Sequence, residues 1–294
     1  MRANANPFKS RYVRLDNLGV HYIDGGEGPA LLMLHAAPET SYVYRNFIEG
    51  LCDEFRCIAI DFPGFGKSEA PETFVPTLDA LSSCLERFML ELDLQDITVL
   101  VHDTAGPVAL RVAENHPERF RGFILTDTFA WPLSHAPQVK RMISLVGSPL
   151  FMALNERFNI LARAIAVRGP LTRKLTPDEA KAYMEATPTA LSRRRQVLWF
   201  RDLIQNERFL KAVEDDLPKI TGLPALTIFG EKDPIRRAGF QERFEQVWPN
   251  IASVVIDGEG HFPHEGAPRA MVEAIRRWTR SGDVPVTKAP LVRP

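Results

Sequence analysis

The segment with the clearest chemical potential places an aspartate between an apolar run and a helical stretch. Residues 97–101 form a mainly apolar run, and small residues follow Asp103 before the helical pattern starts. A tight strand-to-helix turn of this kind projects one side chain at the carboxyl edge of a sheet. A carboxylate is deprotonated at neutral pH without help from a base, so Asp103 can displace a leaving group at a saturated carbon and form an enzyme ester. The alternative is that Asp103 only caps the helix.

An ester on an aspartate has to be hydrolysed by water, and a histidine is the expected base. His261 lies in a Gly-rich loop after the last apolar run, where it could activate that water. Two carboxylates, Asp233 and Asp127, each follow an apolar run and could orient the imidazole. Ligands gather at the carboxyl ends of parallel strands, so both positions suit the role. The chain order nucleophile, acid, histidine favours Asp233 and leaves Asp127 as the alternative acid.

Hydrolysis also requires donors for an oxyanion, which backbone N–H groups can supply. Thr104, directly after the predicted nucleophile, offers one. The loop after the apolar run at 30–34 offers the other, and Ala37 is the better candidate because Pro38 has no N–H. The sequence shows no spacing of His or Cys typical of a metal site, so we expect no metal and no other cofactor. The side chains that could line a substrate pocket are His35, His102, Trp131, Tyr183, Trp199 and Phe262.

The elements that must position these residues alternate along most of the chain. Continuous apolar runs indicate parallel strands buried on both faces, and their alternation with helical stretches predicts a doubly wound, mostly parallel α/β sheet. A hairpin at 12–15 and 20–23 precedes them. The predicted strands are Ala30–Leu34, Cys57–Ile60, Ile97–Val101, Gly122–Leu125, Ala225–Phe229 and Ser253–Ile256, and the predicted helices are Leu78–Leu92, Pro107–Asn115, Phe240–Val247 and Ala267–Thr279.

The alternation stops between residues 133 and 217, where the apolar spacing is helical throughout. We therefore predict a core domain built from residues 1–132 and 218–294, with a helical cap formed by residues 133–217. The tail from residue 282 is rich in proline, and we expect it to be loose. The helices predicted in the cap are Gln138–Leu145, Leu150–Ala166, Pro177–Ala186, Ser192–Asn206 and Glu207–Val213.

Composition narrows the choice of partners. The 294 residues carry a formal net charge of −1, and no basic stripe suggests nucleic acid or an anionic membrane. No segment reaches the ~20 apolar residues of a membrane span, and the N-terminus lacks the apolar core of a secretory signal. Three cysteines form no disulfide framework, which points to reducing cytoplasm. We expect an apolar small-molecule substrate; the oligomeric state is open, with a homodimer as one option.

Several motifs resemble those of α/β-hydrolases in the haloalkane dehalogenase and epoxide hydrolase group. The resemblance covers the chain from about residue 12 to residue 279. The segment LHAAPETSYVYRN at 34–46 resembles the dehalogenase pattern HGNPTSSYxWRN, and DFPGFGKS at 61–68 is similar to DxxGxGxS. His102 and Asp103 match the start of the pattern HDW, GHF at 260–262 resembles GxHF, and SRR at 192–194 resembles a dehalogenase segment in the cap.

The resemblance implies an α/β-hydrolase fold with Asp103 as nucleophile. Dehalogenases hold the leaving halide with a Trp directly after the nucleophile and an Asn in the first loop, whereas this chain has Thr104 and Ala37 there. The backbone donors remain. We expect a dehalogenase-like hydrolase; the alternatives are an epoxide hydrolase, whose cap tyrosines would be represented by Tyr183 alone, a β-lactone decarboxylase, and a non-catalytic ligand-binding protein of the same fold.

Overall fold

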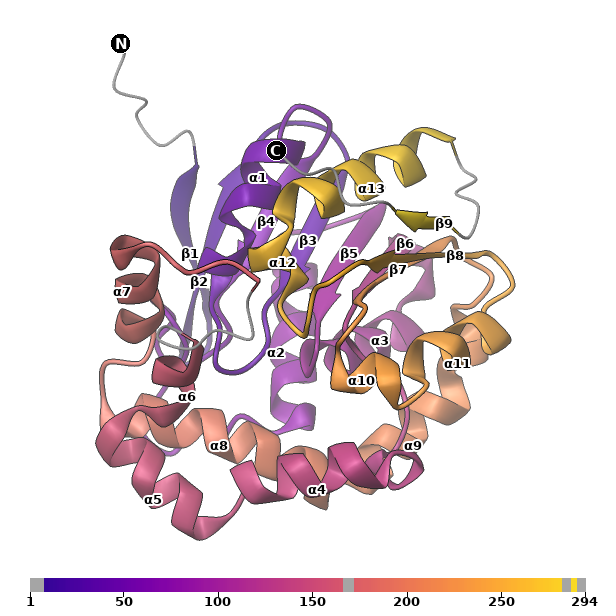
Figure 1. Ribbon diagram of the computed structural model, residues 1–294. Helices are drawn as coiled ribbons and strands as arrows, with labels where there is room; N and C mark the ends of the chain where they lie inside the picture. The colour runs from indigo at the N-terminus through magenta and orange to yellow at the C-terminus, as the bar shows by residue number, and fades with distance from the viewer. Residues whose placement is uncertain (1–7, 166–171, 282–286, 290–294) are drawn as a thin grey trace.

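A nine-stranded sheet forms the centre of the molecule in the computed structural model, which describes residues 8–165, 172–281 and 287–289 (Figure 1). The strand order is β1-β2-β4-β3-β5-β6-β7-β8-β9; β2 is antiparallel to β1 and to β4, and the other pairs are parallel. This confirms the α/β-hydrolase fold. The strands are β1 (Lys9–Leu15), β2 (Leu18–Gly25), β3 (Ala30–Leu34), β4 (Arg56–Ile60), β5 (Ile97–His102), β6 (Phe120–Thr126), β7 (Ala225–Gly230), β8 (Ile251–Ile256) and β9 (Thr287–Ala289).

Helices cover both faces of the sheet, which explains why the central strands are continuously apolar. On one face α1 packs against α13, and on the other α2 packs against α3 (Figure 1). The helices outside the segment between β6 and β7 are α1 (Arg45–Leu51), α2 (Leu78–Glu91), α3 (Ala105–Asn115), α10 (Pro234–Arg237), α11 (Phe240–Val247), α12 (Pro263–Gly266) and α13 (Pro268–Ser281), with short 3-10 turns η1 (Ser41–Tyr44) and η2 (Pro117–Arg119).

Strand register brings the loops of interest to one edge. Leu34 at the end of β3 is paired with Val101 near the end of β5, and His102 is paired with Thr126 at the end of β6. Because these strands are parallel and end at nearly the same level, the loops that follow them lie side by side at the carboxyl edge. The segments after β3, β5 and β6 therefore meet.

Between β6 and β7 every described element is a helix or a 3-10 turn. In Figure 1, α4, α5 and α8 lie together below the sheet, away from α1 and α13. The single helix predicted at 150–166 is wrong, because Asn159 adopts a left-handed φ of +51° and separates α5 from α6. The elements are η3 (Leu133–His135), α4 (Pro137–Val146), α5 (Pro149–Phe158), α6 (Ile160–Arg163), α7 (Pro177–Glu185), α8 (Ala190–Gln205), α9 (Glu207–Asp216) and η5 (Leu217–Lys219).

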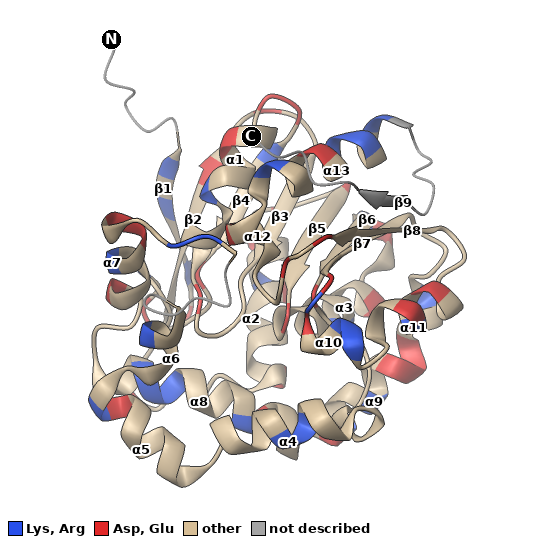
Figure 2. Cartoon of the chain, viewed as in Figure 1, with Lys and Arg blue, Asp and Glu red and all other residues tan. Residues whose placement is uncertain are grey.

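Short elements account for most of the other differences from the sequence prediction. The helices α1, α10 and α12 were not predicted, and neither was β9, which pairs with β8 inside the tail expected to be loose. Residues 282–286 and 290–294 of that tail lie outside the described residues. No described helix is long and apolar enough to cross a membrane. In Figure 2 acidic and basic residues are intermixed along α7 and α11.

One buried carboxylate joins the core to the helical segment. Glu265 in α12 is fully buried and receives two hydrogen bonds from the Arg45 guanidinium, at 2.6 and 2.7 Å. Arg173 and the Tyr183 hydroxyl donate to it at 2.7 and 2.9 Å. Arg45 and Arg173 also bind Glu179 in α7. These charge-assisted hydrogen bonds compensate for the burial of the carboxylate.

Candidate active site

The turn between β5 and α3 holds Asp103 in a strained conformation, with a φ of +43°. Such a φ is uncommon outside glycine and orients the side chain above the sheet edge. The turn is fastened to the end of β6: the Thr128 hydroxyl donates to the Asp103 carbonyl at 2.6 Å, and the Asp103 N–H donates to the Thr126 carbonyl at 3.2 Å. Gly106 is needed here because a Cβ would lie 1.9 Å from the Thr128 Oγ1.

Asp103, His261 and Asp233 meet at the carboxyl edge although they come from three separate loops. The His261 Nε2 lies 3.7 Å from the Asp103 Oδ2, and the His261 Nδ1 lies 2.8 Å from the Asp233 Oδ1, within hydrogen-bond distance. The N-cap residue of α3 is Thr104, and it makes no side-chain capping bond. The Asp103 carboxylate therefore faces the imidazole, which disfavours the capping interpretation of this residue.

The geometry separates the two candidate acids. Asp233 contacts His261 directly and accepts from the Arg236 N–H at 3.1 Å, which fixes its carboxylate. Asp127 instead accepts from the Gly230 N–H at 2.9 Å, and its other oxygen makes no hydrogen bond within the described residues. Burial and the neighbouring charge of Asp233 raise the pKa of Asp127 well above its ordinary value. Burial therefore favours the protonated form of Asp127, and Asp233 is the carboxylate that faces the imidazole.

Asp103 and His261 each shift the pKa of the other. Burial raises the pKa of Asp103 above its usual range, but the contact with His261 opposes that rise. Burial lowers the pKa of His261, yet the charge of Asp233 and the contacts with Asp103 and Asp233 outweigh it and raise that pKa well above its ordinary value. If Asp103 became an ester, the negative charge of its carboxylate would be lost and the pKa of His261 would fall. The imidazole would then be a competent base.

We expect Asp103→Asn to lower the pKa of His261, because the substitution removes one of the two carboxylates that raise it. An NMR titration of the imidazole nitrogens in the two proteins would measure the change. Asp257→Asn, a neutral substitution in the same loop but outside the contacts of His261, is the matched control and should leave the pKa unchanged. Equal pKa values of His261 in the native protein and in Asp103→Asn would contradict the effect of Asp103 on the imidazole.

The two predicted oxyanion donors lie next to each other. Ala37 and Thr104 are both buried, and the Ala37 N–H donates a long hydrogen bond to the Thr104 Oγ1 at 3.4 Å, which an oxyanion would replace. The loop at 35–38 and the residue after Asp103 thus approach closely. The arrangement can offer two backbone N–H groups to an oxygen that develops negative charge beside Asp103.

The two histidines that flank these loops serve as supports. The His35 Nδ1 donates to the Ala36 carbonyl at 2.9 Å, and its Nε2 accepts from the Phe62 N–H at 3.0 Å. Burial lowers the pKa of His35, and burial followed by the charges of the neighbouring His264 and His261 lowers that of His102 well below its ordinary value. Both rings are therefore neutral, and they shape the loops after β3 and β5.

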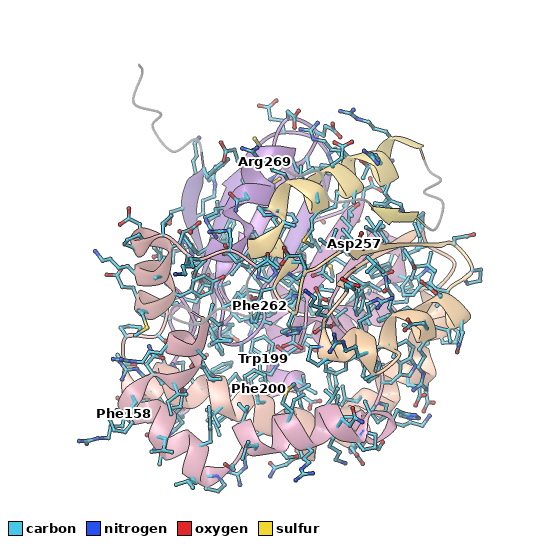
Figure 3. All side chains as sticks on the ribbon, viewed as in Figure 1. Phe158, Trp199, Phe200, Asp257, Phe262 and Arg269 are labelled. Carbon is cyan, nitrogen blue, oxygen red and sulfur yellow. The ribbon has the colours of Figure 1, made fainter. Side chains whose placement is uncertain are left out.

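The predicted pocket side chains divide into two groups. Phe262 lies beside the base, with its ring centroid 5.1 Å from that of His261, and Trp199 is buried with an Nε1 that makes no hydrogen bond within the described residues. Figure 3 shows both inside the molecule, whereas Phe158 lies at the outer end of α5. Trp131 instead packs against Phe244 in α11, with the two ring centroids 4.6 Å apart. The Tyr183 hydroxyl is occupied by Glu265.

Two buried residues next to the candidate site, Glu39 and His264, were not predicted from the sequence. Glu39 follows the oxyanion loop and His264 follows His261 by three positions, so both lie next to recognised motifs. Their position next to these motifs was the only sign in the sequence that they could belong to the site. Two sets of described residues bring three potential metal-ligand atoms within 4.8 Å of one another: Glu39 with His102 and His264, and Asp127 with Asp233 and His261.

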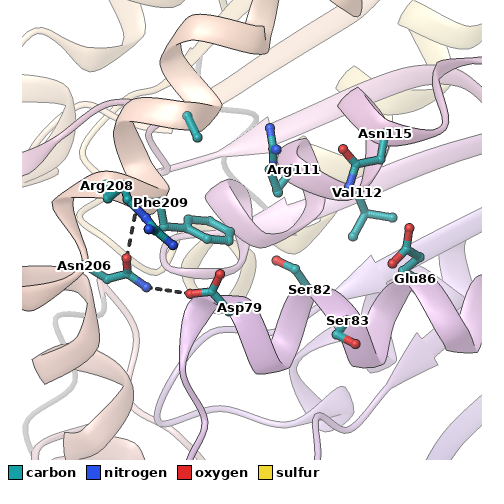
Figure 4. Close-up of a pocket in the computed structure, with 11 residues that line it drawn as sticks. Asp79, Ser82, Ser83, Glu86, Arg111, Val112, Asn115, Asn206, Arg208 and Phe209 are labelled. Carbon is teal, nitrogen blue, oxygen red and sulfur yellow. Dashed lines mark hydrogen bonds between the residues drawn. The ribbon is translucent and has the colours of Figure 1, made fainter.

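A separate pocket opens between α2, α3 and α9 (Figure 4). Its lining is polar: Asp79 accepts from the Asn206 amide at 2.7 Å, and Arg111 and Glu86 face the same space. None of its lining residues belongs to the candidate active site. We therefore assign it no part in the chemistry.

Comparison with known proteins agrees with this geometry. A family model described as the alpha/beta hydrolase fold matches residues 29–268. The chain belongs to the α/β-hydrolase family. Within the family it falls in the haloalkane dehalogenase-like group, since it is 30% identical over 271 residues to haloalkane dehalogenase 2 of Mycobacterium bovis, covering 92% of this chain and 94% of that protein.

Two further proteins indicate the range of similar proteins. The cis-3-alkyl-4-alkyloxetan-2-one decarboxylase of Shewanella oneidensis is 24% identical and covers 92% of this chain and 88% of its own length. The crystal structure of a haloalkane dehalogenase from Bradyrhizobium elkani superimposes with a TM-score of 0.84 at 20% identity, covering 93% of this chain and 98% of that one. At this identity the structural match supports the fold alone.

Proposed function

We propose that this α/β-hydrolase attacks an electrophilic carbon with Asp103 and releases the product by hydrolysing the resulting ester. The observation that carries the proposal is the line of contacts from Asp103 through His261 to Asp233, with the nucleophile at a strained turn. A serine at this turn would need the histidine as a base to attack. An aspartate attacks unaided, and the histidine is then free for the water step.

The reaction has two steps. In the first, an oxygen of Asp103 bonds to the substrate carbon and the leaving group departs as an anion. In the second, His261 takes a proton from water, and the hydroxide attacks the ester carbonyl carbon of Asp103. The N–H groups of Ala37 and Thr104 hold the oxyanion until it collapses. The alcohol leaves with the proton from His261, and one Asp103 oxygen now comes from water.

An anionic leaving group needs a donor in a buried site, and we assign Trp199 to this role. Its ring lies edge-on to His35 of the oxyanion loop, with centroids 6.4 Å apart, and its buried Nε1–H is unpaired among the described residues. A buried N–H without a partner is unfavourable, so a ligand that accepts from it gains that interaction. Trp199 would replace the Trp and Asn donors that Thr104 and Ala37 have displaced.

We expect Trp199→Phe to reduce kcat/KM for bromide release by roughly 10- to 100-fold, the value of one hydrogen bond to a charged group. Halide binding, followed through quenching of tryptophan fluorescence, should weaken in parallel. Trp131→Phe is the control, since Trp131 packs against α11. Unchanged halide release and binding in Trp199→Phe would remove this residue from the leaving-group site.

The deciding experiment is turnover of a panel of brominated alkanes, with epoxides and β-lactones measured beside them. Release of bromide that is lost in Asp103→Asn supports the dehalogenase-like reaction. Formation of diol in place of bromide would contradict it in favour of an epoxide hydrolase. Release of CO2 from a lactone would favour a lyase, and ligand binding without turnover of any of these compounds would favour the non-catalytic alternative.

A β-lactone decarboxylase is the second candidate. Relatives with that activity match nearly the whole chain. The leaving group of such a lactone is a carboxylate inside the substrate, which does not require a halide site. The epoxide alternative has less support, because the Tyr183 hydroxyl that could protonate an epoxide oxygen already donates to the buried Glu265 at 2.9 Å.

We further propose that residues 133–217 act as a cap over an apolar small-molecule substrate, because Trp199 in α8 packs against His35 of the oxyanion loop.

The protein holds free cysteines at positions 52, 57 and 84. Burial raises the pKa of Cys57 and of Cys84 to about 12, so neither is a reactive thiolate. Free buried thiols support action in a reducing cytoplasm.

A further inference from the structure

Three polar side chains that the reaction does not use are packed behind the catalytic histidine. Glu39 and His264 are 1% and 2% exposed, and the His264 Nε2 lies 2.9 Å from the Glu39 Oε1. His102 is placed between His264 and His261, with ring centroids 4.5 and 4.9 Å away. The Glu39 Oε1 and the Nε2 atoms of His102 and His264 make no hydrogen bond within the described residues, so the 2.9 Å contact is a close approach of a carboxylate and an imidazole. A buried carboxylate is costly unless a neighbouring group compensates it, so this contact needs a function.

The contact joins the two loops that hydrolysis requires. The other oxygen of Glu39 accepts from the Ala36 N–H at 3.3 Å, directly before the oxyanion donor Ala37. His264 stands in α12, three residues after the base His261. Glu39 therefore touches the oxyanion loop with one oxygen and the base segment with the other.

We propose that the Glu39–His264 pair positions the oxyanion donor against the catalytic base, and that it acts on hydrolysis of the ester and not on its formation. The inference rests on the proposed function. Attack by Asp103 on the substrate needs neither the Ala37 N–H nor His261 as a base. Attack by water on the ester needs both in register, and a displacement of about 1 Å can cost about 100-fold in rate.

Glu39 and the nearby buried Glu265 have different partners. Glu265, the next residue to His264, is compensated by Arg45, Arg173 and Tyr183. No described Arg or Lys forms an ion pair with Glu39. His264 is therefore the closest basic partner that this buried carboxylate has among its described ion pairs.

The test is the amount of ester present during turnover. Glu39→Gln keeps the shape and removes the charge, and His264→Gln approaches the pair from the other side. Each should lower kcat about tenfold or more and lower KM with it. The first turnover of halide release should stay fast, and mass spectrometry after rapid acid quenching should show more protein with an alkyl adduct than in the native enzyme. The double variant should be no slower than the slower single variant, because both remove the same contact.

Glu114→Gln is the matched control, since Glu114 is another buried glutamate, paired with Arg111 in α3 away from the site. It should show native adduct levels. His261→Phe separates the two hypotheses. If it traps an adduct while Glu39→Gln and His264→Gln do not accumulate one, the positioning role is wrong. If His261→Phe traps none, the ester mechanism itself fails.

Two further results would overturn the proposal. A stoichiometric divalent metal in the purified enzyme, lost in His264→Gln, would mean that Glu39, His102 and His264 are metal ligands and not a direct pair. Slowed first-turnover halide release in both variants would mean that the pair supports attack by Asp103. If one glutamine variant does not fold, the other still tests the contact, because each removes the same interaction from a different loop.

Discussion

Replacing Asp103 with Asn should abolish turnover, with kcat falling by about four orders of magnitude or more. Loss of the nucleophile in covalent catalysis costs about 10⁶-fold in well-studied hydrolases, and an amide is a far weaker nucleophile than a carboxylate. The folded state should survive, since burial opposes the charged form of this residue. Halide release and thermal unfolding, measured on the same preparation, would test both statements.

Asp127→Asn is the control for Asp103→Asn. Asp127 is also a buried aspartate at the end of a strand, but burial raises its pKa well above the ordinary value and its carboxylate accepts from the Gly230 N–H. Its replacement should leave the greater part of the activity. Full activity in Asp103→Asn, with the protein folded, would exclude Asp103 as the nucleophile.

Replacing His261 with Phe should stop the reaction after one turnover and leave the alkyl group on Asp103. The first step does not use the imidazole as a base, so one equivalent of leaving group should appear rapidly. Hydrolysis should slow by about 10³-fold or more, given the usual contribution of a nucleophile–base pair and its general base. The intact variant should gain the mass of the substrate alkyl group, and peptide mapping should place it on Asp103.

Labelled water gives an independent test of the same step in the native enzyme. A single turnover in H2(18)O should place the heavy oxygen in the Asp103 carboxylate, because water attacks the ester carbonyl and not the substrate carbon. The first equivalent of alcohol should then contain the unlabelled oxygen. Label in that first alcohol and none in the protein would show direct attack by water and exclude the ester.

The strands and the approach of Asp103 to His261 were predictable because both leave local signals. Buried parallel strands are continuous apolar runs, and Asp103 and His261 stand in short motifs at their ends, so their approach follows from strand register. The choice between Asp233 and Asp127 was not local. Both follow strands, so chain order alone favoured Asp233, and the 2.8 Å contact of Asp233 with the imidazole appears only in the structure.

What the sequence could not show depends on contacts between distant segments. A left-handed Asn159 divides one helical pattern into two helices, and no periodicity marks such a residue. Glu39 and His264 look like ordinary loop residues until the fold buries them against each other. The sequence does not distinguish Trp131 from Trp199. In the structure Trp131 packs against α11, whereas Trp199 packs against His35 of the oxyanion loop.

The buried Glu265 has a consequence for the order in which the protein is made. Its partner Arg45 lies 220 residues earlier in the chain, and its other partners lie in the helical segment about 80 to 90 residues before it. During translation Arg45 and Arg173 therefore emerge from the ribosome long before Glu265, the carboxylate that pairs with them. Domains fold as their segments emerge, so the connection between core and helical segment closes only after residue 265 has emerged. Because His261 and His264 lie within four residues of Glu265, the nascent protein completes this connection and places its candidate base together.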